Sequence, residues 1–288
     1  MSRVASATGI DRRQGVAGAG RVMLWNGGSV WVGRDPGSVQ AHSHHAIQIT
    51  LASARAMRIR AAAEPAWHET PAAIVMSDRW HLFDGLGHVV AMIFVEPETA
   101  AGRALLTRYG QHDVSVLDDA TLAPHAAALH GVFESGGTDA ALVDAAHAVV
   151  ECLAATPVGH DVVDPRVARV LQRMRARPGE DLDLARASAV ANLSPSRFRH
   201  LFVTETGISF RAYLLWARVG DAVVRGMTGS SWTEAAQQAG FADSAHLSRT
   251  CRRMFGIAPT MLLPQGGGRR EIEEEGAKPR GRKAGASS

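Results

Sequence analysis

Short apolar runs separated by polar residues fill the first third of the chain. Residues 22–25 and 30–32 are apolar and flank Asn26-Gly27-Gly28, a sequence typical of hairpin turns. Further strand-like segments follow at residues 46–51, 57–62, 73–76 and 89–95, with polar breaks between them. Several short strands without helices between them predict a small β-barrel or sandwich over residues 21–97.

The periodicity becomes helical after Pro97. Ala and Leu recur at spacings of three and four residues through residues 122–133 and 140–153, with Gly136-Gly137-Thr138 between them as a turn and helix cap. The apolar stripe of residues 140–153 fits either the barrel or a partner chain, and the sequence leaves both alternatives open. We therefore expect a helical segment over residues 98–156.

Three other segments have the composition of linkers or tails. Residues 1–20 are small and polar, residues 265–288 are rich in Gly and charge, and we expect both to be disordered. Residues 157–163 contain Pro157 and Gly159 and read as a linker. Residues 164–264 read as helix throughout and form a separate domain.

This last domain contains an approximate internal repeat. Apolar, small, turn and apolar positions recur 48 residues apart: Leu184, Ser188, Asn192 and Leu193, then Trp232, Ala236, Gly240 and Phe241. After one inserted residue the repeat continues: Phe198, Phe202, Gly207 and Ile208, then Leu247, Cys251, Gly256 and Ile257. The pattern predicts two helix-turn-helix units.

Turn and cap residues support each unit. Asn192 suits the left-handed conformation that ends a helix, and Ser194 is placed to cap the next helix. In the second unit Gly240 makes the turn and Asp243 or Ser244 supplies the cap. Small residues before each turn let the two helices of a unit cross closely.

Length and charge connect the repeat with DNA. Residues 209–227 predict a connecting helix of about 28 Å at ~1.5 Å per residue. A connector of this length would place two recognition helices in successive major-groove segments, because one DNA turn spans about 34 Å. Residues 164–264 hold 14 Arg against 8 acidic residues, whereas residues 1–163 hold 11 Arg against 16. Residues 164–264 are therefore the candidate region for binding a polyanion.

The outward faces of the two recognition helices supply the candidate DNA contacts. In the first helix Phe198, Leu201 and Phe202 follow a core pattern. We expect Arg199 to read guanine through bidentate bonds, and Arg252 and Arg253 to bind phosphate. The full set of outward residues is Ser196, Arg197, Arg199, His200, Ser244, Ala245, His246, Ser248, Arg249, Arg252 and Arg253.

His42-Ser43-His44, followed by Gln48, is the sharpest local feature of the strand-rich region. Alternation places His42, His44 and Gln48 on one side of a strand, and His81 lies in another strand-like run. This pattern resembles the metal-binding pattern of cupins, and three histidines suit zinc or iron. Gln48 stands where cupins have a carboxylate, so two interpretations stay open: a pocket for an organic effector, or a metal site.

Residues 164–264 resemble the DNA-binding domain of the AraC/XylS family of bacterial transcription regulators. The resemblance is carried by these residues: Leu193-Ser194-Pro195-Ser196, Phe198, Phe202, Thr206-Gly207, Arg218, Ala222, Ala235-Ala236, Gly240-Phe241 and Phe255-Gly256-Ile257-Ala258-Pro259. It implies an N-terminal cupin-like sensor domain and, over residues 98–156, a pair of helices used for dimerisation. It also places base contacts on both recognition helices. Ser188, Asn192 and Cys251 depart from the family pattern. Because Cys251 replaces a large aromatic residue, we expect Arg199 to matter more than Arg249.

The expected fold class is α+β multidomain, with a small N-terminal barrel plus helices and an all-α double helix-turn-helix domain. We expect a cytoplasmic, effector-responsive activator without a cofactor, whose partners are double-stranded DNA and a small molecule. RNA polymerase and a second copy of the chain are further candidate partners. The competing hypothesis is a cupin-type metal-dependent oxygenase or isomerase built on His42, His44 and His81. No apolar run approaches the ~20 residues that span a bilayer, and two cysteines exclude a disulfide framework.

Overall fold

The computed structural model describes residues 5–7, 20–34, 37, 39–53, 56–117, 120–158, 163–177, 180 and 182–262. Most of the expected linker and the whole expected tail, residues 265–288, lie outside these described residues. Within the start that we expected to be disordered, β1 (Ala5–Ala7) pairs antiparallel with β2. We call residues 5–158 the N-terminal half and residues 163–262 the C-terminal half.

The strands of the N-terminal half form two antiparallel sheets. The larger sheet has the order β1-β2-β3-β9-β4-β7-β10, and the smaller sheet has the order β6-β5-β8. The strand bounds are β2 (Arg21–Trp25), β3 (Gly28–Arg34), β4 (Ile47–Ala52), β5 (Met57–Ala61), β6 (His68–Thr70), β7 (Ala72–Val75), β8 (His81–Asp84), β9 (Val89–Val95) and β10 (Val114–Val116). The predicted hairpin turn joins β2 to β3, with Gly27 at a φ of +90°.

Alternation of side chains gives the larger sheet two buried faces. Ile49 pairs with Ile74 on one side and with Ile93 on the other, and this row belongs to the core beneath the helices. Val75 and Val90 belong to a different core on the opposite face. Both faces are thus covered, which explains why β4 and β7 are buried along their whole lengths.

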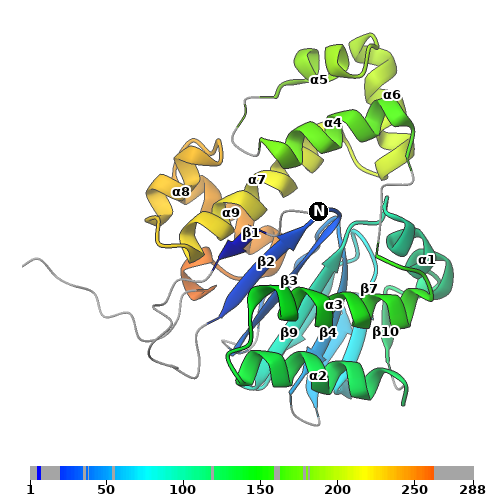
Figure 1. The fold of residues 1–288 in the computed structure, drawn as a ribbon, viewed down its shortest axis with the longest axis vertical. Helices are drawn as coiled ribbons and strands as arrows, with labels where there is room; N and C mark the ends of the chain where they lie inside the picture. The colour runs from blue at the N-terminus through cyan, green and yellow to red at the C-terminus, as the bar shows by residue number, and fades with distance from the viewer. Residues whose placement is uncertain are drawn as a thin grey trace, which may run out of the picture.

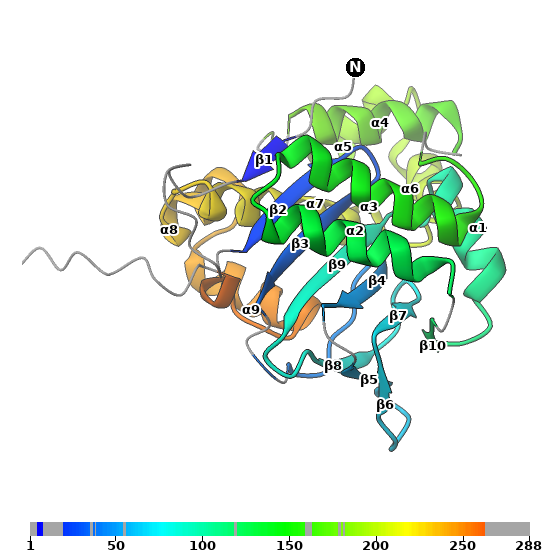
Figure 2. The ribbon, with the colours of Figure 1, turned by 60° about the horizontal axis from the view of Figure 1, so that its bottom comes forward.

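Three helices cover the first face: α1 (Ala100–Tyr109), α2 (Leu122–Glu134) and α3 (Asp139–Ala154) (Figures 1 and 2). Thr138 caps α3 as predicted, because its side chain accepts a hydrogen bond from the Ala141 amide. Leu142, Val149 and Leu153 of the apolar stripe are buried in the same core as the sheet. Of the two alternatives for this stripe, the structure therefore shows packing on the sheet of the same chain.

The closed barrel that we expected is replaced by an open arrangement of two sheets. Among the described residues neither strand order closes on itself, and the smaller sheet covers only the part of the second face near β4 and β7. Helices of the C-terminal half cover the remainder. The ring centroids of Trp31 in β3 and Phe255 lie 4.8 Å apart, and those of Phe94 in β9 and Trp216 lie 6.1 Å apart. Trp216 and Phe255, from helices of the C-terminal half, therefore cover the part of the second face that the smaller sheet leaves open.

The C-terminal half is helical, as predicted (Figure 1). Its helices are α4 (Pro165–Ala176), α5 (Leu184–Val190), α6 (Pro195–Thr206), α7 (Phe210–Met227), α8 (Trp232–Gln238), α9 (Ser244–Phe255) and a 3₁₀ helix, Pro259–Leu262. No helix within the described residues has the length and apolar character needed to span a bilayer.

Candidate functional site

The first helix-turn-helix unit consists of α5 and α6. Asn192 has a φ of +55° between them, and the Ser194 side chain accepts a hydrogen bond from the Arg197 amide. Both predictions of turn chemistry are therefore confirmed. The ring centroids of Phe198 and Phe202 lie 5.4 Å apart, and each also lies 5.4 Å from that of Phe210 in α7. This aromatic cluster fixes α6 against the connecting helix.

The second unit consists of α8 and α9. Gly240 has a φ of +81° at the turn, and Asp243 caps α9 by accepting a 2.6 Å hydrogen bond from the His246 amide. At the start of α8 Ser231 and Glu234 form a capping box that we did not predict. The signal was present in the sequence, since Ser followed three residues later by Glu is the capping-box pattern.

The core of the second unit is built differently from that of the first. Cys251 is buried beside Leu247 and Phe241, at the position that Phe202 occupies in the first repeat. Burial raises the pKa of the Cys251 thiol to about 12, so it behaves as a small apolar side chain. Aromatic residues of the N-terminal half complete this core, which makes the second unit part of a larger structure.

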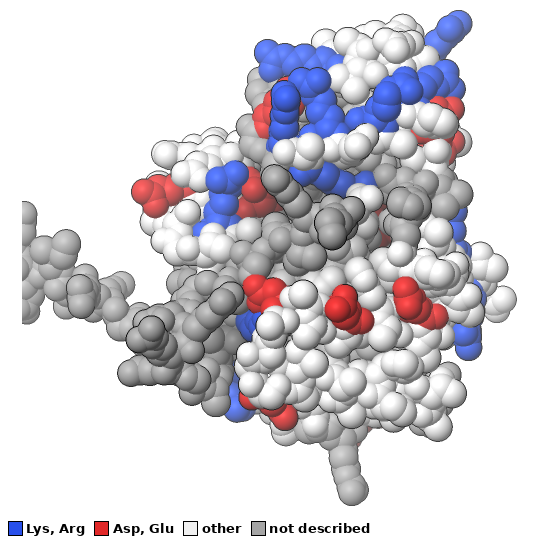
Figure 3. Space-filling model, viewed as in Figure 1, with Lys and Arg blue, Asp and Glu red and all other residues white. Residues whose placement is uncertain are grey.

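The candidate DNA contacts lie on accessible surface. In α6 all four candidates are exposed, and in α9 Ala245 and the three arginines are exposed while Ser244, His246 and Ser248 are half-buried. Figure 3 shows Lys and Arg gathered over the part of the molecule that holds α4, α5 and α6, whereas the surface of α2 and α3 is mostly uncharged. On this face of the molecule the basic side chains are therefore concentrated on the first unit and its neighbour α4.

A basic hollow lies between the start of α7 and α9. It has a volume of about 540 Å³ and is lined in part by Ser209, Arg211, His246, Arg249 and Arg253. The amino terminus of α7 adds partial positive charge from its unpaired amide groups. Three arginine side chains beside a helix amino terminus suit an anionic group.

A larger cavity of about 650 Å³ lies between the two halves. Its walls come from β2, β3 and β9 of the N-terminal half and from α4, α7 and α9 of the C-terminal half. As far as the structure describes the chain, none of the four residues that we assigned to an effector pocket (His42, His44, Gln48 and His81) is among its lining. The aromatic wall consists of Trp25, Trp31, Phe94, Trp216 and Phe255, and the polar lining includes Asn26, Glu96, Gln172, Arg175, Tyr213 and Asp221.

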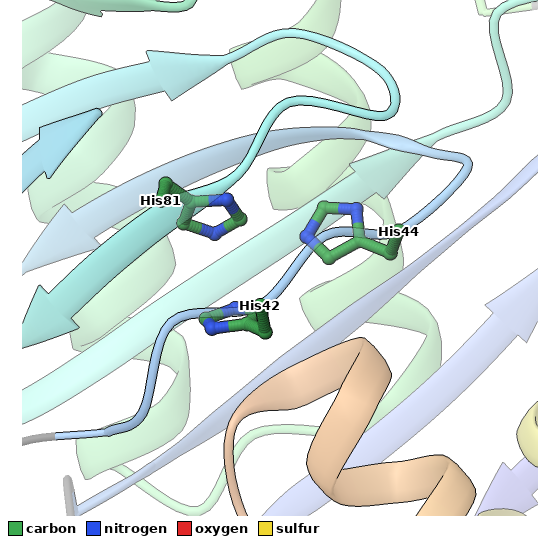
Figure 4. Close-up of side chains that lie close together, drawn as sticks. All are labelled: His42, His44 and His81. Atoms are coloured by element: carbon green, nitrogen blue, oxygen red, sulfur yellow. The ribbon is translucent and has the colours of Figure 1, made fainter. Parts of the chain in front are cut away.

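The structure brings His42, His44 and His81 together at a separate place. One nitrogen of each ring lies within 4.8 Å of one nitrogen of each of the others, and Figure 4 shows the rings grouped around a common space. His42 and His44 precede β4, and His81 begins β8, whose backbone forms a bridge with His42. The fourth predicted residue is Gln48, whose Oε1 atom lies 2.9 Å from Nε2 of His44.

Burial keeps this histidine cluster uncharged at neutral pH. It lowers the pKa of His42 to about 4, and it also lowers the pKa of His44 and of His81. The three side chains are at most 3% exposed, and Gln48 is 1% exposed. The cluster is thus a set of neutral, buried nitrogen atoms with an amide group beside it.

A polar cluster at the seam between the halves was not predicted. His45 and Glu98 form a buried ion pair, and Arg175 of α4 pairs with Glu96. The Tyr213 hydroxyl donates a 3.0 Å hydrogen bond to Oε2 of Glu96. These residues are scattered along the sequence, so no local pattern connects them before the chain is folded.

Comparison with known proteins supports this description. Residues 187–264 match the family model of a helix-turn-helix domain. The HTH-type transcriptional regulator MtrA of Neisseria gonorrhoeae is 24% identical over 105 residues, which cover 36% of this chain and 35% of MtrA. The alignment thus spans about a third of that relative's length.

Two crystal structures of ToxT from Vibrio cholerae have a similar fold. An apo variant gives a TM-score of 0.55 at 11% identity and covers 82% of this chain and 97% of its own. Wild-type ToxT with a bound unsaturated fatty acid gives 0.50 at 12% identity and covers 83% and 95%. The likeness extends over a strand-rich N-terminal half and a helical C-terminal half. The chain therefore carries an AraC-type helix-turn-helix domain at residues 187–264, within a two-part fold similar to that of ToxT.

Proposed function

We propose that this protein is an effector-responsive transcription regulator that binds DNA through both helix-turn-helix units. The observation that carries the proposal is the duplication itself: two units with complete turns and caps stand at the two ends of α7, each with an exposed arginine on its second helix. Two units on one rigid connector are suited to two neighbouring segments of a major groove.

The roles of individual residues follow from their positions. Arg199 and His200 on α6, and Arg249 on α9, are exposed. We propose that these side chains read base edges. Arg252 and Arg253 lie at the end of α9, where phosphate contacts would add affinity without sequence choice. The basic hollow between α7 and α9 would hold a backbone phosphate between the two groove segments.

The cavity between the halves supports the effector part of the proposal. A ligand in this cavity would contact both halves at once, so its binding free energy would depend on how they are arranged. The aromatic wall favours a largely apolar molecule, and Arg175 and Tyr213 provide hydrogen-bond donors. A ToxT structure described as bound to an unsaturated fatty acid is consistent with this class of ligand.

The geometry favours a regulator over a metal-dependent oxygenase or isomerase. Catalysis at a metal needs an open coordination position that the substrate reaches. His42, His44 and His81 are at most 3% exposed, and the lining of the large cavity includes none of them. RNA polymerase and a second copy of the chain remain predicted partners.

DNA binding by the full-length protein tests the proposal. The upstream region of its own gene and a library of random duplexes would be used in mobility-shift and selection assays. We expect selection of one preferred sequence, and weaker binding by Arg199→Ala and Arg249→Ala. Arg58→Ala is the matched control, since it removes one exposed arginine from β5 of the N-terminal half. Binding without sequence preference, or equal affinity of all three variants, would contradict the proposal.

A further inference from the structure

The hydrogen bonds of the histidine cluster determine where its protons lie. The Nδ1 atoms of His42, His44 and His81 lie 2.9, 2.8 and 2.9 Å from the backbone carbonyl oxygens of residues 40, 46 and 79. A carbonyl oxygen only accepts hydrogen bonds, so each Nδ1 carries the ring proton. The lone pair of each neutral ring is therefore on Nε2.

The groups around His44 and His81 do not satisfy the lone pairs of these two rings. Nε2 of His81 is buried and has no hydrogen-bond partner among the described residues. The Gln48 amide donates a 2.8 Å hydrogen bond to Oγ1 of Thr50, which leaves its Oε1 atom 2.9 Å from Nε2 of His44. Two acceptors thus face one another. Turning the Gln48 amide over would give His44 a donor but would leave His81 without one.

We propose that His42, His44 and His81, together with Oε1 of Gln48, bind one divalent transition-metal ion of the Zn²⁺ class. A cation is the species that pairs with several converging lone pairs at once. Ligand nitrogens lie about 2.1 Å from zinc, so pairs of ligands lie within about 4.2 Å of each other. One nitrogen of each ring lies within 4.8 Å of one nitrogen of each of the others, so a small rotation of the side chains would close a shell around one ion. Neutral imidazole donors favour Zn²⁺, Co²⁺, Ni²⁺ or Cu²⁺ over Mg²⁺ or Ca²⁺.

The hydrogen bonds at Nδ1 strengthen this assignment. Metal-binding histidines commonly donate their second ring N–H to a carbonyl or carboxylate, which fixes the tautomer and aims the other nitrogen at the ion. All three rings already have this arrangement. The site is therefore preorganised on a strand bridge, because the backbones of His42 and His81 are joined by two hydrogen bonds of 3.1 and 3.0 Å.

The carboxyl end of α9 packs directly on this cluster. A Cβ atom at Gly256 would lie 2.9 Å from Nδ1 of His42, and the Phe255 ring stacks against His44 at 6.1 Å between centroids. The amide of Ser43 also donates to the Arg253 carbonyl oxygen. An ion that fixes His42 and His44 would thus fix the surface against which α9 rests. We infer that the ion holds α9, the second recognition helix, against the N-terminal half and thereby regulates DNA binding. This regulation rests on the proposed DNA-binding function.

Metal binding by the full-length protein, first dialysed against a chelator, tests the site. Co²⁺ would serve as the spectroscopic probe, and Zn²⁺ would compete for the site. We expect one ion per chain and visible absorption bands of low-coordinate Co²⁺. His81→Gln and, as a second variant, His42→Gln should bind more than ~100-fold more weakly, since even loss of an outer-sphere partner costs 10–100-fold. Circular dichroism without metal would verify that both variants fold.

His130→Gln is the matched control. It removes a buried histidine from α2, on the other face of the larger sheet, and should leave metal affinity unchanged. Equal affinity of His81→Gln, His42→Gln and the unmodified protein would overturn the site, as would absence of stoichiometric Co²⁺ binding. Because no DNA is used, this result is independent of whether the DNA-binding proposal holds.

Amide hydrogen exchange of residues 244–257 tests the effect on α9. Saturating Zn²⁺ should slow exchange in this segment of the unmodified protein and should have no effect in His81→Gln. Stoichiometric metal binding without slower exchange would overturn the inference that the ion holds α9.

Discussion

Nε2 of His45 lies 3.0 Å from Oε2 of Glu98, and their side chains are 2% and 0% exposed. The pair lies at the seam between the halves: Nη2 of Arg175 is 3.9 Å from Oε1 of Glu98, and the Tyr213 ring packs against His45 at 5.3 Å. A buried charge is costly without its partner. The pair is therefore a sensitive point in the contact of the N-terminal half with α4 and α7 of the C-terminal half.

Replacing one partner of this pair should destabilise the protein strongly. His45→Gln leaves the Glu98 carboxylate buried without its partner charge, and we expect a loss of about 3–5 kcal/mol in the free energy of unfolding. Arg58→Ala breaks the exposed pair of Arg58 and Glu69, whose side chains are 47% and 59% exposed, and should cost less than about 1 kcal/mol. Urea denaturation monitored by circular dichroism measures both. Similar losses in the two variants would contradict the interpretation.

The same pair predicts a pH dependence of stability. Burial opposes the charged form of His45, but the hydrogen bond and charge of Glu98 raise its pKa above the usual 6.5. Its contribution is complete below pH 6.5 and is lost as the pH rises through the raised pKa. Burial likewise opposes ionisation of Glu98, but His45 holds its pKa below 4.5. That contribution is complete above pH 4.5 and is lost as the pH falls through the lowered pKa.

The difference in unfolding free energy between the unmodified protein and His45→Gln isolates this effect from other buried histidines. It should be largest between pH 4.5 and 6.5 and should decrease toward alkaline pH. Urea titrations at a series of pH values measure it. A difference that grows above neutral pH would show that His45 is not stabilised as a cation.

Two glycines of α7 should respond oppositely to alanine. A Cβ atom at Gly226 would overlap the ring of Trp232, which packs α8 against α7, so Gly226→Ala should cost about 1–3 kcal/mol. At Gly220 the nearest atom to a new Cβ is Cδ2 of Leu24 at 3.6 Å, an ordinary contact. Gly220→Ala should therefore stabilise the helix by roughly 0.5–1 kcal/mol. Thermal unfolding compares the two, and equal effects would argue against close packing of α7 and α8.

The two recognition helices should contribute unequally to DNA binding. Arg199 lies on α6, which the rings of Phe198, Phe202 and Phe210 hold in place. In contrast, α9 packs around the small Cys251 side chain and against the N-terminal half. Loss of a bidentate contact to guanine costs about 1–3 kcal/mol, and we expect Arg199→Ala to reach this range and Arg249→Ala to fall below it. Fluorescence anisotropy at one fixed salt concentration measures both. A larger effect of Arg249→Ala would reverse the predicted order.

Local chemistry explains which features were predictable from the sequence. The turns at Asn192 and Gly240 and the caps at Ser194 and Asp243 depend on atoms a few residues apart, and all four are present. His42, His44 and Gln48 also lie together as predicted, because they are close in sequence, although only Gln48 belongs to β4 and the two histidines precede it. These features need no knowledge of the tertiary fold.

Contacts between distant segments were not predictable in the same way. Trp31 and Phe255 pack together although they are 224 residues apart, and nothing near either residue indicates its partner. The open arrangement of the two sheets, the cavity between the halves and the pair of His45 with Glu98 all depend on such contacts. Apolar periodicity shows which face is buried, but it does not show which element covers it.

The shared core of β2, β3 and β9 with α7, α8 and α9 has a consequence for solubility. If the chain were divided between α3 and α4, water would reach Trp31 and Phe94 on one fragment and Trp216 and Phe255 on the other. Both fragments would then carry a contiguous aromatic surface of the kind that promotes aggregation. We therefore expect each half to aggregate more readily alone, because the C-terminal half shares its core with the N-terminal half.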